Sequence, residues 1–334
     1  MHRLPGRSPA IGPAVNPSLP PRRAFLRFAG AAAATAPLAS VLHGVGTPAV
    51  SGSAGSPPAK RSAQRFPLCG LEKHFFEKYS AAQTAQAYAD IGIEIELTVR
   101  PEGHIKPAHA AEEMPLLAAA LAEKGRRILI VASSFVRPDE PHVEGTLRTM
   151  KTLGIGYYRH RGFKYVPGRS LKEQIASFRS QAREFAAMNR EIGVQALYQN
   201  HAGADYAGAA IWDLDLILDD IDPGLFGVAL DTRHLLVELG RAWPTGIRLI
   251  APRIGALFVK SFRWEHDRTV ETSLAEGIVT AAMVNQIVAD RPQLPISIHV
   301  EYRKFEAVPF AERSGIVADF RSDAGRLREW LGLV

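Results

Sequence analysis

The sequence predicts a (β/α)8 barrel, an α/β fold in which eight parallel strands close into a cylinder and helices surround them. After residue 65, short β-type runs alternate with longer helical patterns, and eight such repeats fit into roughly 270 residues, the size of this TIM-barrel architecture. The rival is an open doubly wound sheet, which usually has about five to seven strands and a glycine-rich phosphate loop. The sequence contains no such loop.

The strands are expected where apolar residues cluster or alternate with polar ones. The second expected strand alternates Ile, Glu, Ile, Glu, Leu, Thr and Val over 93–99, and the third is the apolar run RILIVAS at 127–133. The remaining strands are expected at 65–69, 156–161, 194–201, 226–231, 254–262 and 296–302.

Helices are expected between the strands, where apolar residues recur with helical spacing. Ser170, with Glu173 three residues later, has the form of a capping box that satisfies free N–H groups at a helix start. The expected helices cover about 80–90, 109–125, 141–153, 170–192, 211–220, 244–252, 279–290 and 311–331.

Residues 1–65 are expected to form a leader and linker that precede the barrel at 66–334. The motif Arg-Arg-Ala-Phe-Leu-Arg at 22–27 resembles a twin-arginine export signal, and an alanine-rich apolar run follows at 28–45. That run contains glycine, threonine and proline, so it is too short and too weakly apolar for a membrane span. The signal implies a periplasmic or other extracytoplasmic location, and a disordered basic tail is the alternative.

The positive charge of the chain lies in the leader. The sequence has 40 basic and 34 acidic residues, but eight basic and no acidic residues fall in 1–65. Subtracting them leaves 32 basic against 34 acidic residues, a net charge of −2 for the rest. A basic face, which nucleic-acid binding needs, is therefore not expected on the barrel. The single cysteine, Cys69, excludes an intramolecular disulfide and is expected to be a buried strand residue.

Alternation along the strands directs polar side chains into the barrel near the carboxyl ends of the strands. On the last expected strand Ser297, His299 and Glu301 share one face, while the other face is apolar and suits packing against helices. The carboxyl end of a barrel is where active sites are built. For Glu94 and His299 a purely structural role is the alternative. On the other strands the inward residues are expected to include Glu94, Glu96, Thr98, Arg159, Arg161, Leu197, Gln199, His201, Ala229, Asp231, Ala256, Phe258 and Lys260.

Several segments resemble the xylose isomerase-like barrel family of sugar isomerases and epimerases. They cover nearly all of 66–305. The resemblance implies a divalent metal (Mn, Mg or Zn) held by Glu, Asp, His and Glu on strands five to eight, with the two glutamates also acting as acid and base. The segments are ELTVRP at 96–101 with the following Gly103-His104, YQNH at 198–201, IWDL at 211–214, DTRH at 231–234, VKSF at 259–262 and HVEY at 299–302.

Carried over by position, Asp231 and Glu301 match two of the family's metal ligands. Gln199 stands in the place of the strand-five glutamate, and Phe258 stands near the place of the strand-seven histidine. Glutamine can bind a hard cation through its oxygen but cannot act as a base, and phenylalanine cannot bind a metal. A histidine and waters are then expected to complete the metal site. The expected metal ligands are Gln199, Asp231, His234 and Glu301.

The resemblance implies proton transfer next to the carbonyl group of a sugar. Glu301 is expected to take the proton, His234 to bind a hydroxyl or act as a second acid, and Lys260 to stabilise an enolate oxygen. Because Gln199 replaces a glutamate, a one-base isomerisation or an elimination fits better than a symmetric two-carboxylate epimerisation. The expected substrate-binding residues are Glu96, His104, Arg159, His201, Trp264 and His299.

Other functions stay open at this stage. A lyase or hydrolase of keto-glycosides would use the same site, and a non-catalytic sugar-binding barrel that lost its metal would explain Gln199 and Phe258. An apurinic endonuclease needs a histidine-rich trinuclear zinc site, which three late histidines do not supply. The expected partner is a small carbohydrate that is unphosphorylated, because export disfavours sugar phosphates and no phosphate clamp is visible on strands seven and eight. Neither nucleic acid nor a stable membrane span is expected, and homo-oligomers are common in the family.

Overall fold

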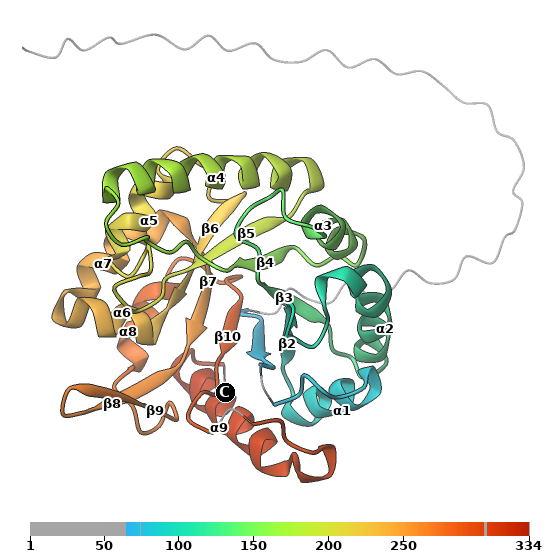
Figure 1. Cartoon of the computed structure of the whole chain (residues 1–334). Coiled ribbons are helices and arrows are strands. Elements are labelled where there is room, and N and C mark those ends of the chain that lie inside the picture. Colours follow the sequence, from blue (N-terminus) through green and yellow to red (C-terminus); the bar gives the residue numbers. More distant parts are fainter. Residues whose placement is uncertain (1–64, 74, 304–305, 334) are drawn as a thin grey trace, which may run out of the picture. The chain divides into compact units, whose positions relative to one another are not determined.

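The computed structural model describes residues 65–73, 75–303 and 306–333. Eight parallel strands close into a barrel in the order β1, β10, β7, β6, β5, β4, β3, β2, and helices surround it (Figure 1). The predicted (β/α)8 fold is therefore confirmed. The predicted leader at 1–65, with its twin-arginine motif at 22–27, lies outside the described residues except for Arg65.

Seven of the eight barrel strands lie within the predicted bounds, whereas the first, predicted at 65–69, begins three residues later and ends two residues later, at Leu68–Leu71. The predicted strand 296–302 ends four residues early, at Ile298, so Glu301 lies beyond the strand. The predicted strand 254–262 ends at Val259 because the backbone N–H and C=O of Lys260 bond to the Thr232 hydroxyl, at 3.2 and 2.9 Å. The chain then forms a hairpin outside the barrel, β8 (Ser261–Glu265) with β9 (Arg268–Thr272). The barrel strands are β1 (Leu68–Leu71), β2 (Glu94–Val99), β3 (Ile128–Ser133), β4 (Tyr157–His160), β5 (Gln195–Gln199), β6 (Phe226–Asp231), β7 (Ile254–Val259) and β10 (Ile296–Ile298).

The helices also follow the prediction, with one addition. Helix α6 (Thr232–Leu239) begins directly after β6, at a position where no helix is predicted, and Asp231 is its N-cap. At Ser170 only the serine half of the expected capping box forms, whereas Ser80 and Gln83 make a complete one. The other α-helices are α1 (Ala81–Ile91), α2 (Ala110–Glu123), α3 (Val143–Thr152), α4 (Leu171–Ile192), α5 (Ile211–Leu218), α7 (Trp243–Ile250), α8 (Ala281–Val288) and α9 (Ser314–Trp330). Short 3-10 turns lie at Pro107–His109, Gly240–Ala242, Ala251–Arg253 and Phe310–Glu312.

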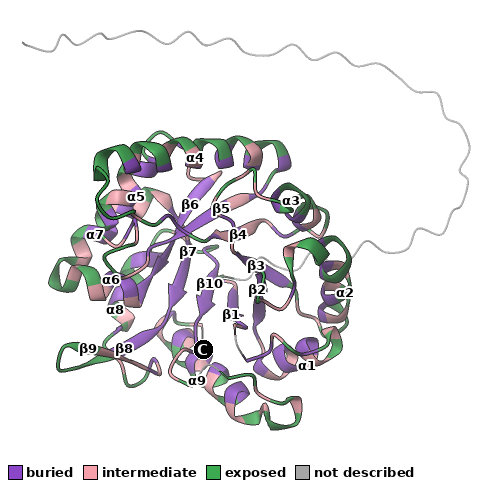
Figure 2. Ribbon diagram, in the orientation of Figure 1, coloured by how far each residue is buried: buried purple, intermediate pink, exposed green. Residues whose placement is uncertain are grey.

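Apolar side chains fill both sides of the strands. The large core lies between the strands and the inner faces of the helices, whose outer faces are exposed (Figure 2). A smaller apolar cluster occupies the barrel interior, and its members include four residues predicted to face inward and the predicted buried cysteine. This packing leaves polar inward residues at the carboxyl ends of the strands, where the site lies. The interior cluster consists of Cys69, Leu129, Ile130, Leu197, Ala229, Ala256 and Phe258.

No helix in the described part of the chain combines the length and apolar character needed to cross a bilayer.

Candidate active site

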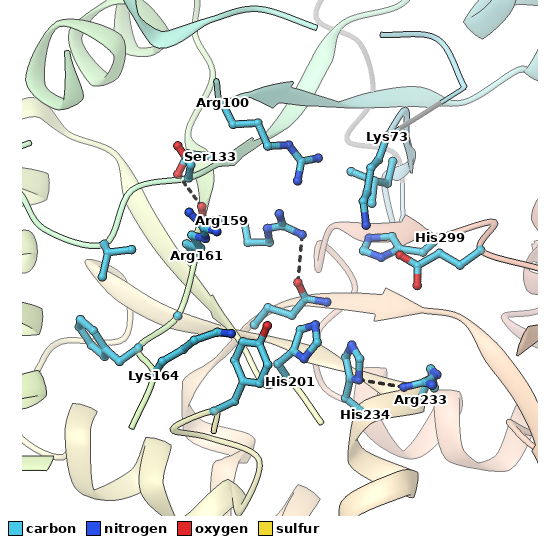
Figure 3. Close-up of a pocket in the computed structure, with 18 of the residues that line it drawn as sticks. Lys73, Arg100, Ser133, Arg159, Arg161, Lys164, His201, Arg233, His234 and His299 are labelled. Carbon is cyan, nitrogen blue, oxygen red and sulfur yellow. Dashed lines mark hydrogen bonds between the residues drawn. The ribbon is translucent and has the colours of Figure 1, made fainter. Parts of the chain in front are cut away.

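A cavity of about 1100 Å³ opens at the carboxyl ends of the barrel strands (Figure 3). Arg100 directly follows β2, Gln199 ends β5, and Lys260 directly follows β7. The cavity therefore lies at the end of the barrel that the sequence predicts. Its polar lining consists mainly of Lys73, Arg100, Ser133, Arg159, Arg161, Lys164, Gln199, His201, Tyr206, Arg233, His234, Lys260, Glu271, His299 and Glu301.

The ammonium group of Lys260 lines the cavity directly after β7 and contacts three polar groups. Its Nζ is 2.9 Å from Glu301 Oε2, 3.3 Å from Asp231 Oδ2 and 3.1 Å from His234 Nε2. Three acceptors match the three protons of an ammonium group. Burial lowers the pKa of Lys260, but the carboxylates of Asp231 and Glu301 outweigh it, so the pKa is raised above its ordinary value. Lys260 is therefore a permanent cation in the site.

Asp231 and His234 are placed together by the junction of β6 and α6. The Asp231 carboxylate is fully buried beneath the cavity, and its Oδ1 accepts a hydrogen bond of 3.0 Å from the backbone N–H of His234. This is an N-cap contact, so the aspartate that ends the strand also starts the helix. The Asp-x-x-His spacing then returns the imidazole of His234 to the cavity one helical turn later.

Glu301 and His234 both line the cavity beside Lys260 and can exchange protons with a ligand. Burial would raise the pKa of Glu301, but the Lys260 ammonium and then His299 and Lys73 hold it at about 2. Burial, and next the charge of Lys260, lower the pKa of His234 well below its ordinary value. Near neutral pH the site therefore holds an ionised carboxylate beside a neutral imidazole.

His201 stacks on His234 with ring centroids 4.1 Å apart, and its other face stacks on Tyr206 at 4.2 Å. Burial lowers the pKa of His201 below its ordinary value. Both imidazoles line the cavity and present neutral rings to a ligand.

Gln199 is held between a carboxylate and a guanidinium. Its Nε2 donates to Asp231 Oδ2 at 2.8 Å, and its Oε1 accepts from Arg159 Nη1 at 3.0 Å. These two partners determine which end of the amide is nitrogen and which is oxygen, because only with Nε2 toward Asp231 and Oε1 toward Arg159 does each donor face an acceptor. The amide oxygen thus faces Arg159 and points away from the acceptors around Lys260.

Glu96 crosses the barrel interior to support His299. Its Oε2 accepts a hydrogen bond of 2.5 Å from Ser297 Oγ and lies 2.9 Å from His299 Nε2. Glu96 is fully buried and does not line the cavity, in contrast to the expectation that it binds substrate. Because carboxylate and imidazole come from opposite sides of β1, the pair fixes the orientation of the His299 ring at the cavity wall.

His104 and Trp264 also lie elsewhere than expected. The loop after β2 folds back, so that His104 Nδ1 is 2.8 Å from Glu72 Oε2, and the imidazole does not line the cavity. Trp264 is 48% exposed on the β8–β9 hairpin and does not line the cavity either, because the hairpin leaves the barrel after β7. A substrate-binding role for these two side chains receives no support from their positions.

The structure adds several cations to the site that the sequence analysis did not name as site residues, although it expected Arg161 to face inward. Arg100 and Arg161 each occupy the position directly after a barrel strand, and Lys73 lies two residues after β1. A rule that counts the first residues beyond each strand would have found them, since those residues rim the cavity in a barrel. Lys164 and Arg233 also line the cavity from loop and helix positions.

Residues 85–329 match the family described as the xylose isomerase-like TIM barrel. The chain belongs to this family. Its fold is similar to that of 3-keto-D-glucoside 4-epimerase from E. coli, with a TM-score of 0.58, 12% identity, and coverage of 79% of this chain and 100% of that one. It is also similar to a D-tagatose 3-epimerase-like protein, with a TM-score of 0.62, 13% identity, and coverage of 80% and 98%. No curated protein matches the sequence.

A third similar structure is that of the IolI protein with a bound zinc atom, with a TM-score of 0.60, 13% identity, and coverage of 80% of this chain and 99% of that one. At these identities the similarity concerns the fold alone. The side chains of this chain, and not the zinc of the IolI protein, therefore decide whether this barrel can hold a metal.

The residues present do not fit the divalent metal that the family resemblance implies. Phe258 has no donor atom, and the amide oxygen of Gln199 is already bonded to Arg159. The two carboxylates that remain already hold the Lys260 ammonium at 2.9 and 3.3 Å. Among the described residues, no three or more His, Cys, Asp or Glu side chains are arranged as a metal-binding group. A metal at this site thus stays a prediction from the resemblance.

Proposed function

We propose that this member of the xylose isomerase-like family is an enzyme that moves a proton at the carbon next to the carbonyl group of an unphosphorylated sugar. One observation carries the proposal: the Lys260 ammonium lies between two carboxylates and beside a neutral imidazole on the floor of a cavity large enough for a sugar. The activities named for similar structures, epimerisation of keto-glucosides and of related sugars, support it.

In this mechanism Lys260 supplies the positive charge. The carbonyl oxygen of the sugar accepts a hydrogen bond from Nζ, so the ammonium stabilises the negative charge that develops there as the neighbouring carbon loses its proton. One N–H bond of Lys260 is then redirected from Glu301 to the substrate. The pKa of Glu301 rises as a result, which brings its carboxylate closer to the basicity that proton transfer requires.

Glu301 takes the proton from carbon and returns it to the adjacent carbon of the enediol. His234 is neutral, and its Nε2 is released when Lys260 Nζ turns to the carbonyl oxygen; it takes the proton of the neighbouring hydroxyl and delivers it to the former carbonyl oxygen, so that atoms and charges balance. Gln199 cannot accept a proton, so no second carboxylate acts from strand β5. A one-base isomerisation is therefore favoured over a two-base epimerisation.

The test is turnover of a panel of aldoses, ketoses and 3-keto-glycosides by the purified protein in D2O, followed by NMR. We expect solvent deuterium at the carbon next to the carbonyl, together with an isomerised sugar. A Trp264→Ala control should retain kcat within about twofold, because this side chain lies outside the cavity. Release of an aglycone would instead identify the lyase alternative. If no sugar shows hydrogen exchange or turnover, with or without added Mn, Mg or Zn, the enzyme proposal is wrong and the non-catalytic sugar-binding barrel is the remaining function.

We also propose that the protein acts outside the cytoplasm, on the basis of the Arg-Arg motif at 22–27 alone. Replacing both Arg22 and Arg23 by lysine is expected to leave the protein in the cytoplasm, because twin-arginine signals depend on that pair. Fractionation of cells that express the wild type and the double variant measures this. Equal periplasmic recovery of both would contradict the proposed route.

A further inference from the structure

The lining of the cavity is strongly cationic. Seven of its lining residues are Lys or Arg, and three are Glu. Two of the glutamates have cation partners: Glu271 pairs with Arg233 at 2.7 Å and Glu301 with Lys260 at 2.9 Å. The third, Glu102, lies exposed on the loop after β2. The other cations that line the cavity are Lys73, Arg100, Arg159, Arg161 and Lys164.

Three of these cations are arginines at the ends of β2 and β4, and they point into the same cavity (Figure 3). Arg159 bonds through Nη1 to the neutral amide of Gln199, and no carboxylate of the described residues forms an ion pair with its guanidinium. Arg100 Nη2 is buried, has no hydrogen-bond partner within the described ranges, and lies 3.9 Å from the nearest carboxylate, that of Glu77. No hydrogen bond or ion pair engages the Arg161 side chain among the described residues.

The crowding of like charges has an electrostatic cost. Burial, and next the charge of Arg159, lower the pKa of Arg100 to about 10. Burial also lowers the pKa of Lys73, with Arg100, Arg159 and Lys260 acting in the same direction and Glu301 against it. Half-buried cations that face one another are unfavourable unless an anion compensates them. The arrangement is thus complementary to an anionic ligand.

Two of the arginines, Arg100 and Arg161, lie opposite the proposed catalytic groups. In the circular strand order, β7 faces β3, and β2 and β4 flank β3. Arg100 and Arg161 therefore reach the cavity from the side across from Lys260. A ligand that fills the cavity would meet arginines at one end and the ammonium at the other.

We propose that the substrate is a sugar acid, whose carboxylate is bound by Arg100, Arg159 and Arg161 while its carbonyl end meets Lys260. This assignment rests on the proposed function and narrows its substrate class. A guanidinium offers parallel N–H groups that match a carboxylate in a bidentate pair, and such charge-assisted bonds are the strong ones. A hexuronate carries its carbonyl group and its carboxylate at opposite ends, as the cavity requires, whereas an aldonate supplies the carboxylate alone and tests the anion site by itself.

A carboxylate fits better than a phosphate because of where the cations lie. Phosphate sites in these barrels are commonly built from the loops after strands seven and eight with a helix N-terminus. Here the chain after β7 forms the β8–β9 hairpin, whose Glu271 carboxylate lines the cavity and pairs with Arg233. On that side Arg233 and Lys260 are already paired with carboxylates, whereas the arginines without such a close pair lie after β2 and in and after β4.

The test is calorimetric binding of hexuronates and aldonates, such as glucuronate, galacturonate and gluconate, compared with the neutral parent sugars and glucose 6-phosphate. We expect at least one sugar acid to bind about tenfold or more tightly than its neutral parent, with an affinity that falls as salt is added. Arg161→Gln is expected to weaken that binding about tenfold and to leave neutral sugars unaffected. Arg190→Gln is the matched control, since Arg190 is exposed in the last turn of α4 at the other end of the barrel.

Equal affinity for acids and neutral sugars would overturn the proposal, as would an Arg161→Gln variant that binds the acid as the wild type does. Tighter, Arg161-dependent binding of the sugar phosphate would overturn the assignment to a carboxylate. Binding needs no turnover, so the two proposals fail separately. Sugar acids that bind without hydrogen exchange in D2O would support the anion site and contradict the isomerase. Turnover of neutral sugars but not of sugar acids would support the isomerase and contradict the anion site.

Discussion

Replacing Glu301 by glutamine is expected to lower kcat about 10³-fold while the barrel stays folded. Glu301 is the carboxylate on the cavity floor that binds Lys260 at 2.9 Å, and the proposed mechanism makes it the proton acceptor. Glutamine keeps an oxygen that accepts a hydrogen bond from Lys260 but cannot accept a proton. Loss of a general base typically costs about 10²–10⁴-fold in rate. Steady-state kinetics on any sugar that the panel identifies, with circular dichroism for the fold, measure the effect.

Glu271→Gln is the matched control, because Glu271 also lines the cavity but pairs with Arg233. Its kcat is expected to remain within about tenfold of the wild type, since no proton passes through it. A Glu301→Gln variant with more than a tenth of the wild-type kcat would exclude Glu301 as the base.

The same substitution should change how stability depends on pH. The pKa of Glu301 is about 2 in the folded protein, below its ordinary value of 4.5, so its carboxylate stabilises the fold above pH 4.5, and that contribution is lost as the pH falls toward 2. At neutral pH the contribution is on the order of 3 kcal/mol. The difference in Tm between wild type and Glu301→Gln should therefore be largest near pH 7 and vanish near pH 2. A difference that does not change with pH would contradict the ion pair.

Replacing Lys260 by methionine is expected to abolish most of the activity and to lower the free energy of unfolding by about 3–5 kcal/mol. The substitution keeps the side-chain length but leaves two carboxylates, those of Asp231 and Glu301, buried beside each other without a cation. One of them will then hold a proton, so its folded pKa rises above the unfolded value. The stability of the variant should be higher at pH 5 than at pH 8 and fall as the pH rises through that pKa. Urea denaturation at the two pH values measures this.

The activity of the wild type is expected to survive dialysis against EDTA, because Lys260 already supplies the positive charge of the site. In a Lys260→Ala variant the ammonium is removed and space opens among Asp231, His234 and Glu301, so added Zn²⁺ should raise the Tm of the variant more than that of the wild type. Loss of wild-type activity in EDTA, with recovery on adding Mn²⁺ or Zn²⁺, would contradict the role of Lys260. It would also support the metal site that the resemblance implies.

The number and positions of the barrel strands could be predicted because local patterns determine them. The run at 127–133 and the alternation at 93–99 correspond to β3 and β2 within one residue at each end. The period of two along a strand also predicted that Leu197 and Phe258 face the barrel interior. Helix α6 was missed because its eight residues directly follow β6, where Asp231 ends the strand and caps the helix. No turn residue marks that boundary.

The sequence alone thus determined the barrel, its polar carboxyl end, the strand that ends in Asp231 and the strands that precede Lys260 and Glu301, because strand period and strand order depend on neighbouring residues. Closure of the barrel determined which of these side chains meet. Glu96 and His299 are 203 positions apart and contact across the interior, and Lys260 and Glu301 are 41 apart. The direction of a side chain beyond a strand end depends on charges and packing contributed by distant segments. For that reason the ammonium between two carboxylates and the facing arginines became visible only in three dimensions.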